Sequence, residues 1–187
     1  MPQNPEVSVQ ERQFIQRVLL NQDQDAFEQL ILFHQSSVRS FLRRLCHGNP
    51  TLADDLAQDS FLHAFLHLAS YRGEGRFLNW LFKIAYQRFV LVLRRHKPTQ
   101  DLESHSIPDP RTLLQPAQDA RLTLGQLLPH LGKEQRAALV LHYQYGLTHT
   151  EIAEAVGLPL GTVKTHLLRG KETLLNLASQ KTNRGIQ

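Results

Sequence analysis

The sequence lacks the features of several large protein classes. It has one cysteine, Cys46, in 187 residues, so no disulfide can form within the chain. Its longest apolar run, Phe89 to Leu93, is far too short to cross a bilayer. The residues from Met1 to Glu6 have neither the basic nor the apolar block of a signal peptide. We therefore expect a cytoplasmic protein with no membrane insertion.

Patterns typical of enzymes are also missing. No glycine-rich phosphate loop follows a strand, because the sequence has no strand pattern. Cys46 and His47 have no base-orienting carboxylate nearby in the sequence, which argues against a nucleophile. His63 and His67 have the i, i+4 spacing of two metal ligands, but no third ligand is evident, and such histidines more often flank a buried stripe or a partner surface. The sequence predicts no catalytic residue, no metal and no cofactor.

Apolar residues recur instead at helical spacing along most of the chain. The first ten or so residues show no such pattern and are expected to be unstructured. The predicted helices span about 25–46, 51–69, 76–96, 120–131, 133–145, 148–156 and 160–177. The fold class is therefore all-α.

A proline-containing acidic segment divides these helices into two groups. We interpret residues 98–118 as a flexible linker, whose roughly twenty residues could reach about 65 Å when fully extended. The net charge is +3 over residues 1–97, −3 over 98–119 and +4 from 120 onward, so a polyanion would be attracted to the two ends and repelled by the middle. The sequence predicts two small helical domains, 23–97 and 119–180, with residues 1–22 forming a tail and the start of the first helix, and residues 181–187 a tail.

The most specific local pattern spans residues 147–167. Thr148 and Glu151 have the S/T-x-x-E spacing of a capping box. Gly157 suits a left-handed helix end, and a proline two residues later suits the start of the next helix. Two short helices joined by a tight turn form a helix-turn-helix, which places its second helix in the major groove of DNA. An ordinary helical hairpin with a basic face is the alternative.

The second helix of this motif has one apolar face and one face rich in hydrogen-bond donors. Val163, Leu167 and Leu174 recur at i, i+4 and i+11 and can face a core. The opposite face has no carboxylate before Glu172. The candidate DNA contacts on it are Thr162, Lys164, Thr165, His166, Arg169 and Lys171.

A second candidate surface lies between Arg76 and Lys97. This stretch has six Lys or Arg residues, no acidic residue, and five of the fourteen Phe, Tyr and Trp residues. Basic charge neutralises phosphates and flat rings stack on unpaired bases, so the mixture suits partly melted DNA. About half of the aromatic residues are expected in a core, with Phe77, Leu81, Ile84 and Phe89 sharing a buried face.

Trp80 and Tyr71 are the better candidates for exposed stacking. The loop that begins at Tyr71 contains two glycines and two arginines and could hold a flipped base, although a simple surface turn would look the same. The candidate residues of this surface are Tyr71, Arg72, Arg76, Asn79, Trp80, Lys83, Gln87, Arg94 and Arg95.

Three segments together resemble the extracytoplasmic-function (ECF) group of bacterial sigma factors, the smallest members of the sigma-70 family. They are residues 55–61, 71–85 and 146–165, in the family's order and spacing. The resemblance covers about residues 25–97 and 120–177. It implies a dissociable subunit that directs core RNA polymerase to promoter DNA and helps to open it, and it leaves room for an anti-sigma factor as a further partner.

The resemblance also implies a role for each surface. The recognition helix would read the promoter element about 35 base pairs upstream of the start site. The surface around Trp80 would capture the element about 10 base pairs upstream as it melts. The helix at 51–69 would dock on the clamp helices of the largest polymerase subunit. Its candidate docking residues are Asp54, Asp55, Gln58, Asp59, Phe61 and Leu62.

Some residues depart from the family pattern or allow another explanation. Gln87 stands where relatives commonly have Asn, and Gly170 should weaken the recognition helix by about 1 kcal/mol relative to Ala. Asp54 and Asp55 lie in a first helical turn, where the helix dipole favours acids regardless of partners. The rival functions are a dimeric helix-turn-helix transcriptional regulator and a helical adaptor with incidental basic faces. The regulator would bind a palindrome without polymerase, and the adaptor would show no salt-sensitive affinity for DNA.

Overall fold

A computed structural model describes residues 5–47, 49–95 and 124–184, and within these ranges the chain is helical with no strand. The all-α prediction is confirmed. The N-terminal block contains α1 (Pro5–Asn21), α2 (Gln24–Leu45), α3 (Pro50–Leu66), the short 3-10 helix η1 (Leu68–Ser70) and α4 (Phe77–Arg95). The C-terminal block contains α5 (Leu124–Leu127), the 3-10 helix η3 (Leu128–His130), α6 (Lys133–Tyr145), α7 (His149–Val156) and α8 (Leu160–Arg184). The predicted linker at 98–118 lies outside the described residues.

The start of the chain differs from the prediction. Residues 5–10, expected to be unstructured, belong to α1, which packs on α2. Ile15 and Val18 are buried, and Oε1 of Glu11 lies 2.6 Å from Nε2 of His34 in α2, with both side chains buried. The predicted tail at the other end also begins as helix, because α8 continues to Arg184. The helical spacing of Glu11, Ile15 and Val18 is the local signal that favours α1.

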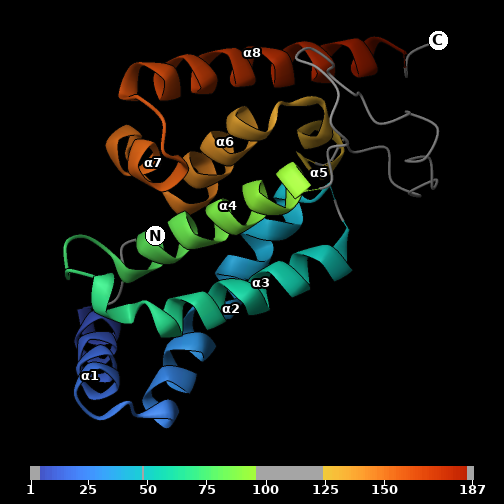
Figure 1. Cartoon of the computed structure of the whole chain (residues 1–187). Coiled ribbons are helices and arrows are strands. Elements are labelled where there is room, and N and C mark those ends of the chain that lie inside the picture. Colours follow the sequence, from blue (N-terminus) through green and yellow to red (C-terminus); the bar gives the residue numbers. More distant parts are fainter. Residues whose placement is uncertain (1–4, 48, 96–123, 185–187) are drawn as a thin grey trace.

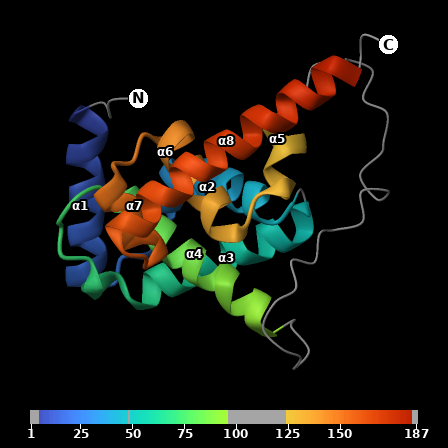
Figure 2. The same cartoon turned by 90° about the horizontal axis from the view of Figure 1, so that it is seen from above.

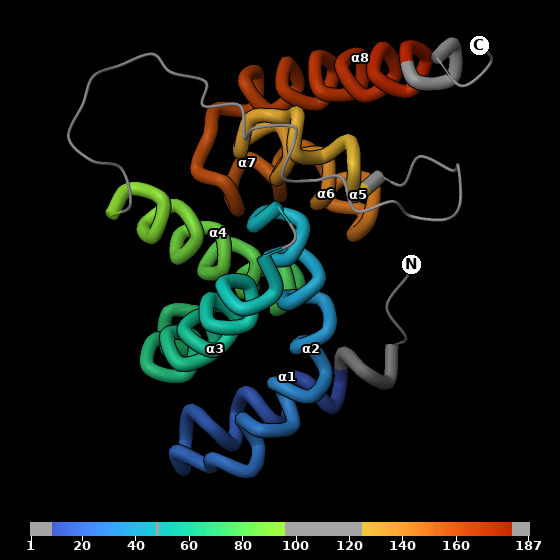
Figure 3. Tube along the Cα trace, turned by 90° about the vertical axis from the view of Figure 1, so that its right-hand side faces the viewer, coloured from blue at the N-terminus to red at the C-terminus, as the bar shows by residue number. Residues whose placement is uncertain are grey.

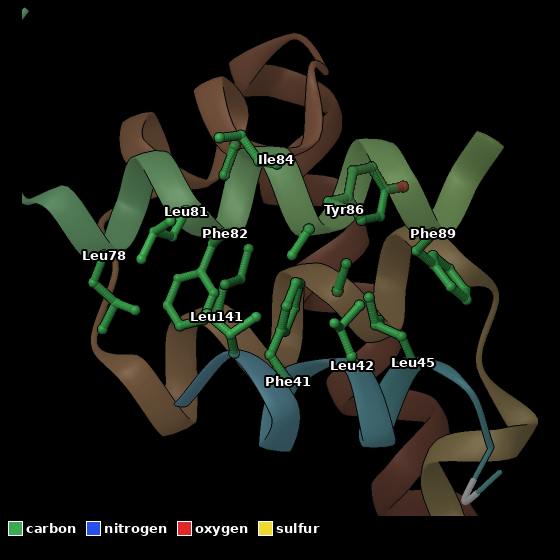
Figure 4. Close-up of a cluster of buried hydrophobic side chains, with 14 of the residues drawn as sticks. Phe41, Leu42, Leu45, Leu78, Leu81, Phe82, Ile84, Tyr86, Phe89 and Leu141 are labelled. Carbon is green, nitrogen blue, oxygen red and sulfur yellow. The ribbon is translucent and has the colours of Figure 1, made fainter. Parts of the chain in front are cut away.

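The two blocks pack directly on one another and share a hydrophobic core. α4 lies between α3 on one side and α7 on the other (Figure 1 and Figure 3). Figure 4 shows Leu141 of α6 beside Phe41 and Leu42 of α2, so a side chain of one block fills the interior of the other. The rings of Phe82 in α4 and Tyr145 in α6 have centroids 4.5 Å apart.

The long helix α8 crosses the top of the C-terminal block and packs on α6 (Figure 2). Gly170 lies at this contact and is buried. A Cβ atom at this position would stand 2.7 Å from Cδ1 of Leu139, closer than two carbon atoms pack. The sequence suggested only that Gly170 weakens the helix. The structure shows that the glycine also allows α8 to approach α6.

Candidate nucleic-acid interface

The core-facing side of α4 holds more of its aromatic residues than expected. Phe77, Leu81, Ile84 and Phe89 are all buried, as predicted. Phe82 and Tyr86 are buried as well, so four of the five aromatic residues of this helix belong to the core (Figure 4). Only the fifth, Trp80, reaches the surface.

Trp80 and Tyr71 are half-buried rather than fully exposed. The Trp80 ring stacks on the ring of buried Phe77, with centroids 5.4 Å apart and an interplanar angle of 27°. The centroids of the Tyr71 and Trp80 rings are 5.7 Å apart. The Tyr71 hydroxyl donates to the carbonyl of Gly75 at 2.9 Å and closes the loop. Gly73 and Gly75 both have positive φ angles, which side chains rarely adopt. Packing therefore fixes both rings and leaves part of each accessible.

Polar residues surround this pair of rings. Arg76 and Asn79 are half-buried, and the remaining predicted members of the surface are exposed: Arg72, Lys83, Gln87, Arg94 and Arg95. Arg88, on the same helix, forms an ion pair with Asp59 of α3 at 3.4 Å. The structure thus brings the predicted melting residues together around one cavity, except for Arg94 and Arg95, which lie apart from it in the last turn of α4.

A cavity of about 650 Å³ separates this surface from α7 of the helix-turn-helix. Arg76, Asn79 and Trp80 line one wall, and Glu151 and Glu154 line the other. Three buried polar atoms on the cavity wall have no hydrogen-bond partner among the described residues: His63 Nδ1, Arg76 Nε and Asn79 Oδ1. Unpartnered buried donors and acceptors are costly, so the wall can gain from a polar ligand.

Glu151 connects the two blocks. Its Oε1 accepts a hydrogen bond of 2.7 Å from the Asn79 amide nitrogen, so the two walls of the cavity touch at this point. Burial alone would raise the pKa of Glu151, but hydrogen bonds from Thr148 and Asn79 and the charge of Arg76 outweigh it and hold the pKa below its usual value. The carboxylate is therefore ionised at neutral pH and faces the cationic wall.

The helix-turn-helix has the predicted geometry. The Thr148 amide donates to Glu151 Oε2 at 2.8 Å and the Glu151 amide donates to Thr148 Oγ1 at 3.3 Å, which completes the capping box. Gly157 ends α7 with φ 69°, in the left-handed region. Val163 and Leu167 are buried, and Leu174 is half-buried.

The outer face of α8 carries the predicted recognition residues. Lys164, Thr165, Arg169 and Lys171 are exposed, and Thr162 and His166 are half-buried. The Thr165 hydroxyl donates to the Gly161 carbonyl at 3.0 Å, within the helix. The structure leaves this face open, with cations spread along it.

The predicted docking residues of α3 lie beside an apolar groove of about 400 Å³ between α2 and α3. Gln58, Phe61 and Leu62 line it, although Phe61 is mostly buried and Leu62 is 59% exposed. The α2 side of the groove, formed by Phe27 and Ile31 among others, was not predicted. Those two residues looked like ordinary core positions, and periodicity does not tell a core from a groove wall.

Asp54 and Asp59, two of the three acidic candidates, form ion pairs with cations of the same block. Asp54 lies 3.3 Å from Nη2 of Arg43 and 3.8 Å from Nε of Arg39. Asp59 pairs with Arg88, and Asp55 is exposed.

Asp54 and Asp55 lie beyond the first turn of α3, which begins at Pro50 and has no acid in that turn, so the dipole explanation offered above does not apply to them. The ion pairs of Asp54 and Asp59 are partly exposed to solvent, so they add little to stability and leave the carboxylates accessible to a partner.

His63 and His67 were considered above as metal ligands, and Cys46 as a nucleophile. The rings of His63 and His67 lie 4.2 Å apart, and no group of three metal-ligating side chains occurs among the described residues. Burial raises the pKa of the Cys46 thiol to about 11. None of the helices in the described ranges is long and apolar enough to span a membrane.

Comparison with known protein families gives two matches that follow the two blocks. Residues 30–99 match the model of sigma-70 region 2, and residues 121–174 match that of sigma-70 region 4. The RNA polymerase sigma-H factor of Pseudomonas aeruginosa is 30% identical over 88% of this chain and 92% of its own length. The ECF sigma factor SigW of Bacillus subtilis is 28% identical over 81% of this chain and 88% of its own length.

Two solved structures have a similar fold. The sigma factor RpoE of Bartonella quintana, crystallised with the anti-sigma factor NepR, aligns with a TM-score of 0.65 and 25% identity over 82% of this chain and 96% of that one. CnrH, in complex with the cytosolic domain of CnrY, aligns with a TM-score of 0.62 and 21% identity over 92% of this chain and 96% of that one.

Proposed function

Because this chain belongs to the sigma-70 family, and within it to the ECF group, we propose that it directs core RNA polymerase to promoters and helps to open them. It binds the polymerase with its N-terminal block and reads promoter DNA with both blocks. It carries out no covalent chemistry of its own. An anti-sigma factor is a further proposed partner, since the RpoE structure similar to this chain contains one.

The observation that carries the proposal is the combination of cations and aligned rings on α4. Trp80 and Tyr71 are held in place by Phe77, beside a loop whose glycines allow close approach of a backbone. Arg72, Arg76 and Lys83 surround them, and α4 itself has no carboxylate. This arrangement fits unpaired bases and their phosphates better than closed duplex.

The other two surfaces have complementary roles. The outer face of α8 enters the major groove of the upstream element, with Arg169 and Lys164 contacting base edges or phosphates. The groove between α2 and α3 receives the clamp helices of the polymerase, with exposed Leu62 contributing apolar surface and Asp54, Asp55 and Asp59 contributing charge.

The test of this function is transcription in vitro with purified core polymerase and genomic templates. We expect initiation at a discrete set of promoters that core polymerase alone does not use. A chain that binds palindromic duplex as a dimer and gives no initiation with polymerase would instead be a helix-turn-helix regulator. No salt-sensitive DNA binding with or without polymerase would indicate an adaptor.

Two substitutions test the DNA contacts. Trp80→Ala should impair promoter opening more than closed-complex formation, and a premelted template should restore much of the activity. Equal defects on duplex and premelted templates would contradict the stacking role. Arg169→Ala should relax the choice of upstream element, and an unchanged sequence preference would remove Arg169 from the recognition surface.

A third substitution tests the polymerase groove. Leu62→Asp places a charge in the apolar groove, at a side chain exposed enough for the fold to survive, and should weaken polymerase binding by roughly tenfold or more. Leu20→Asp is the matched control, because Leu20 is 81% exposed on α1 and does not line the groove. Similar affinities of the two variants for polymerase would show that the groove is not the docking site.

A further inference from the structure

A buried polar pair lies behind the two rings that reach the surface beside α4. Oε1 of Glu11 in α1 lies 2.6 Å from Nε2 of His34 in α2, and the two side chains are 7% and 5% exposed. The ring of His34 faces the ring of Phe77, with centroids 5.5 Å apart. Phe77 in turn stacks on Trp80 and meets Tyr71 edge-on, at a centroid distance of 5.2 Å. A continuous series of contacts therefore joins α1 to Trp80 and Tyr71.

α1 also lies beside the segment that leads into Tyr71. It contacts η1, the short helix that ends at Ser70, immediately before Tyr71 (Figure 1). Burial raises the pKa of Tyr71, and the negative charge of Glu11 raises it further, against a smaller opposite effect of Arg12. Glu11 thus stands close enough to Tyr71 to act on its hydroxyl, in addition to its contact with His34.

The rings lie where α4 itself restrains them least. Phe77 is the first residue of α4, and Trp80 belongs to the same turn. The loop before them contains Gly73 and Gly75, both with positive φ angles. The ends of helices lack part of their backbone hydrogen bonds and fray, so side chains there depend on packing from other elements. Phe77 is only 1% exposed, and His34 supplies part of the packing around it.

A polar pair at this position has a property that apolar residues lack. Burial removes the hydration of both groups, and apolar residues of similar volume often stabilise a core as well or better. A hydrogen bond, however, tolerates only a narrow range of distances and angles, whereas apolar contacts have no preferred direction. The contact with Glu11 therefore fixes the plane of the His34 ring. Aromatic rings prefer particular tilted or offset orientations, so a fixed imidazole also restrains Phe77.

We propose that Glu11 and His34 are positioning residues for strand capture, the binding of unpaired bases by Trp80 and Tyr71. The pair holds Phe77 from behind and thereby sets the angle at which the two outer rings meet the bases. This inference rests on the proposed function. Both residues of the pair are buried and neither lines the groove between α2 and α3, so they act in promoter opening and not in polymerase binding.

The first experiment follows Trp80 in the free chain. Trp80 is the only tryptophan, so the decay of its fluorescence anisotropy reports how freely this ring moves. Glu11→Leu/His34→Leu keeps a buried apolar pair and removes both the directional contact and the ring that faces Phe77. Val18→Ala is the matched control, because it truncates a buried aliphatic side chain of α1 about two turns away from Glu11. Each chain is measured at a temperature at which its far-UV circular dichroism shows it to be fully folded.

We expect the amplitude of the fast component of the decay, which reports side-chain motion within nanoseconds, to about double in Glu11→Leu/His34→Leu. Val18→Ala should decay like wild type. An unchanged decay in the double variant would overturn the proposal. An equal increase in Val18→Ala would overturn it as well, since any loosening of α1 would then free the ring.

The second experiment measures promoter opening with core polymerase, by the permanganate reactivity of unpaired thymines. Glu11→Leu/His34→Leu should open promoters about three- to tenfold less than wild type, the range expected for loss of one aromatic contact, with unchanged closed-complex affinity. Val18→Ala should open promoters normally. Glu11→Gln, which keeps a hydrogen-bonding group at the same place, should stay close to wild type.

Three results would contradict these expectations in different ways. Full opening by the double variant would overturn the positioning role, even if Trp80 moves more freely. A defect of Glu11→Gln as large as that of the double variant would show that the charge of Glu11, and not its directional contact, matters. Failure of the wild-type chain to initiate with polymerase would count against the proposed function itself, while the anisotropy decay would still decide whether the pair holds the ring.

Discussion

Gly170 shows how one residue sets the distance between two helices. Helix propensity alone predicts that Gly170→Ala stabilises α8 by about 1 kcal/mol. The added Cβ would lie 2.7 Å from Leu139 Cδ1, and overpacking of this kind costs about 1–3 kcal/mol. We therefore expect a net loss of about 1 kcal/mol in the free energy of unfolding, measured by urea titration.

Gly161→Ala is the matched control for that substitution. Gly161 lies on the same helix, a Cβ atom added there would have no neighbouring atom within 4 Å, and its φ angle is not positive. Its substitution should be neutral or slightly stabilising. If Gly170→Ala stabilises the chain as much as Gly161→Ala does, Leu139 moves aside and the close packing has little energetic weight.

His47 should make stability depend on pH. Burial, and then the charge of Arg136, lower the pKa of His47 from 6.5 to about 4. The unfolded chain therefore binds a proton on His47 at a higher pH than the folded chain does. The contribution of His47 to stability is complete above about pH 6.5 and is lost as the pH falls towards about 4.

The measurement is urea unfolding at about pH 7, 6 and 5, compared with His47→Asn. Asn tolerates the positive φ of 54° at this position, so the variant removes the titrating ring without adding backbone strain. Wild type should lose more stability on acidification than the variant. Parallel pH profiles would show that His47 titrates normally in the folded chain.

At the scale of single elements, the sequence predicted most helices because their ends carry local chemical signals. The capping box of Thr148 and Glu151 and the left-handed Gly157 lie where expected. The same local reasoning could not show that Glu151 also accepts a hydrogen bond from Asn79, 72 residues earlier in the chain. The spacing of neighbouring residues carries no information about such a long-range contact. It also overestimated the exposure of Trp80, whose ring is held by Phe77.

The helix that the prediction missed, α1, depends on a buried polar pair. Glu11→Ala would leave His34 buried without its partner and should cost about 2 kcal/mol in the free energy of unfolding. Glu11→Leu/His34→Leu replaces both polar groups and should cost less than the single substitution. Glu28→Ala, at an exposed position of α2, is the control and should change little. A single substitution without effect in denaturant titration would mean that α1 is not held by this pair.

At the scale of the whole molecule, the sequence predicted two blocks but not their contact. Phe82, Leu141 and Tyr145 recur at the spacing of ordinary core residues. Such spacing predicts that a side chain is buried, but it does not predict which other element the side chain packs against. The predicted linker suggested independent domains. The shared core instead makes each block part of the interior of the other.

A shared core has a consequence for unfolding. Two blocks that bury apolar side chains against each other should lose their structure together, so wild type should show one calorimetric transition whose enthalpy equals the van't Hoff enthalpy. Gln144 Nε2 of the C-terminal block donates to Ser40 Oγ of the N-terminal block at 3.0 Å. Ser40→Glu/Gln144→Glu places two like charges at this exposed contact, which should separate the blocks and split the transition into two. Each single variant should keep one transition, because one solvated charge at the interface edge has no like charge to repel. Two transitions in wild type would mean that the contacts between the two blocks are too weak to couple their unfolding.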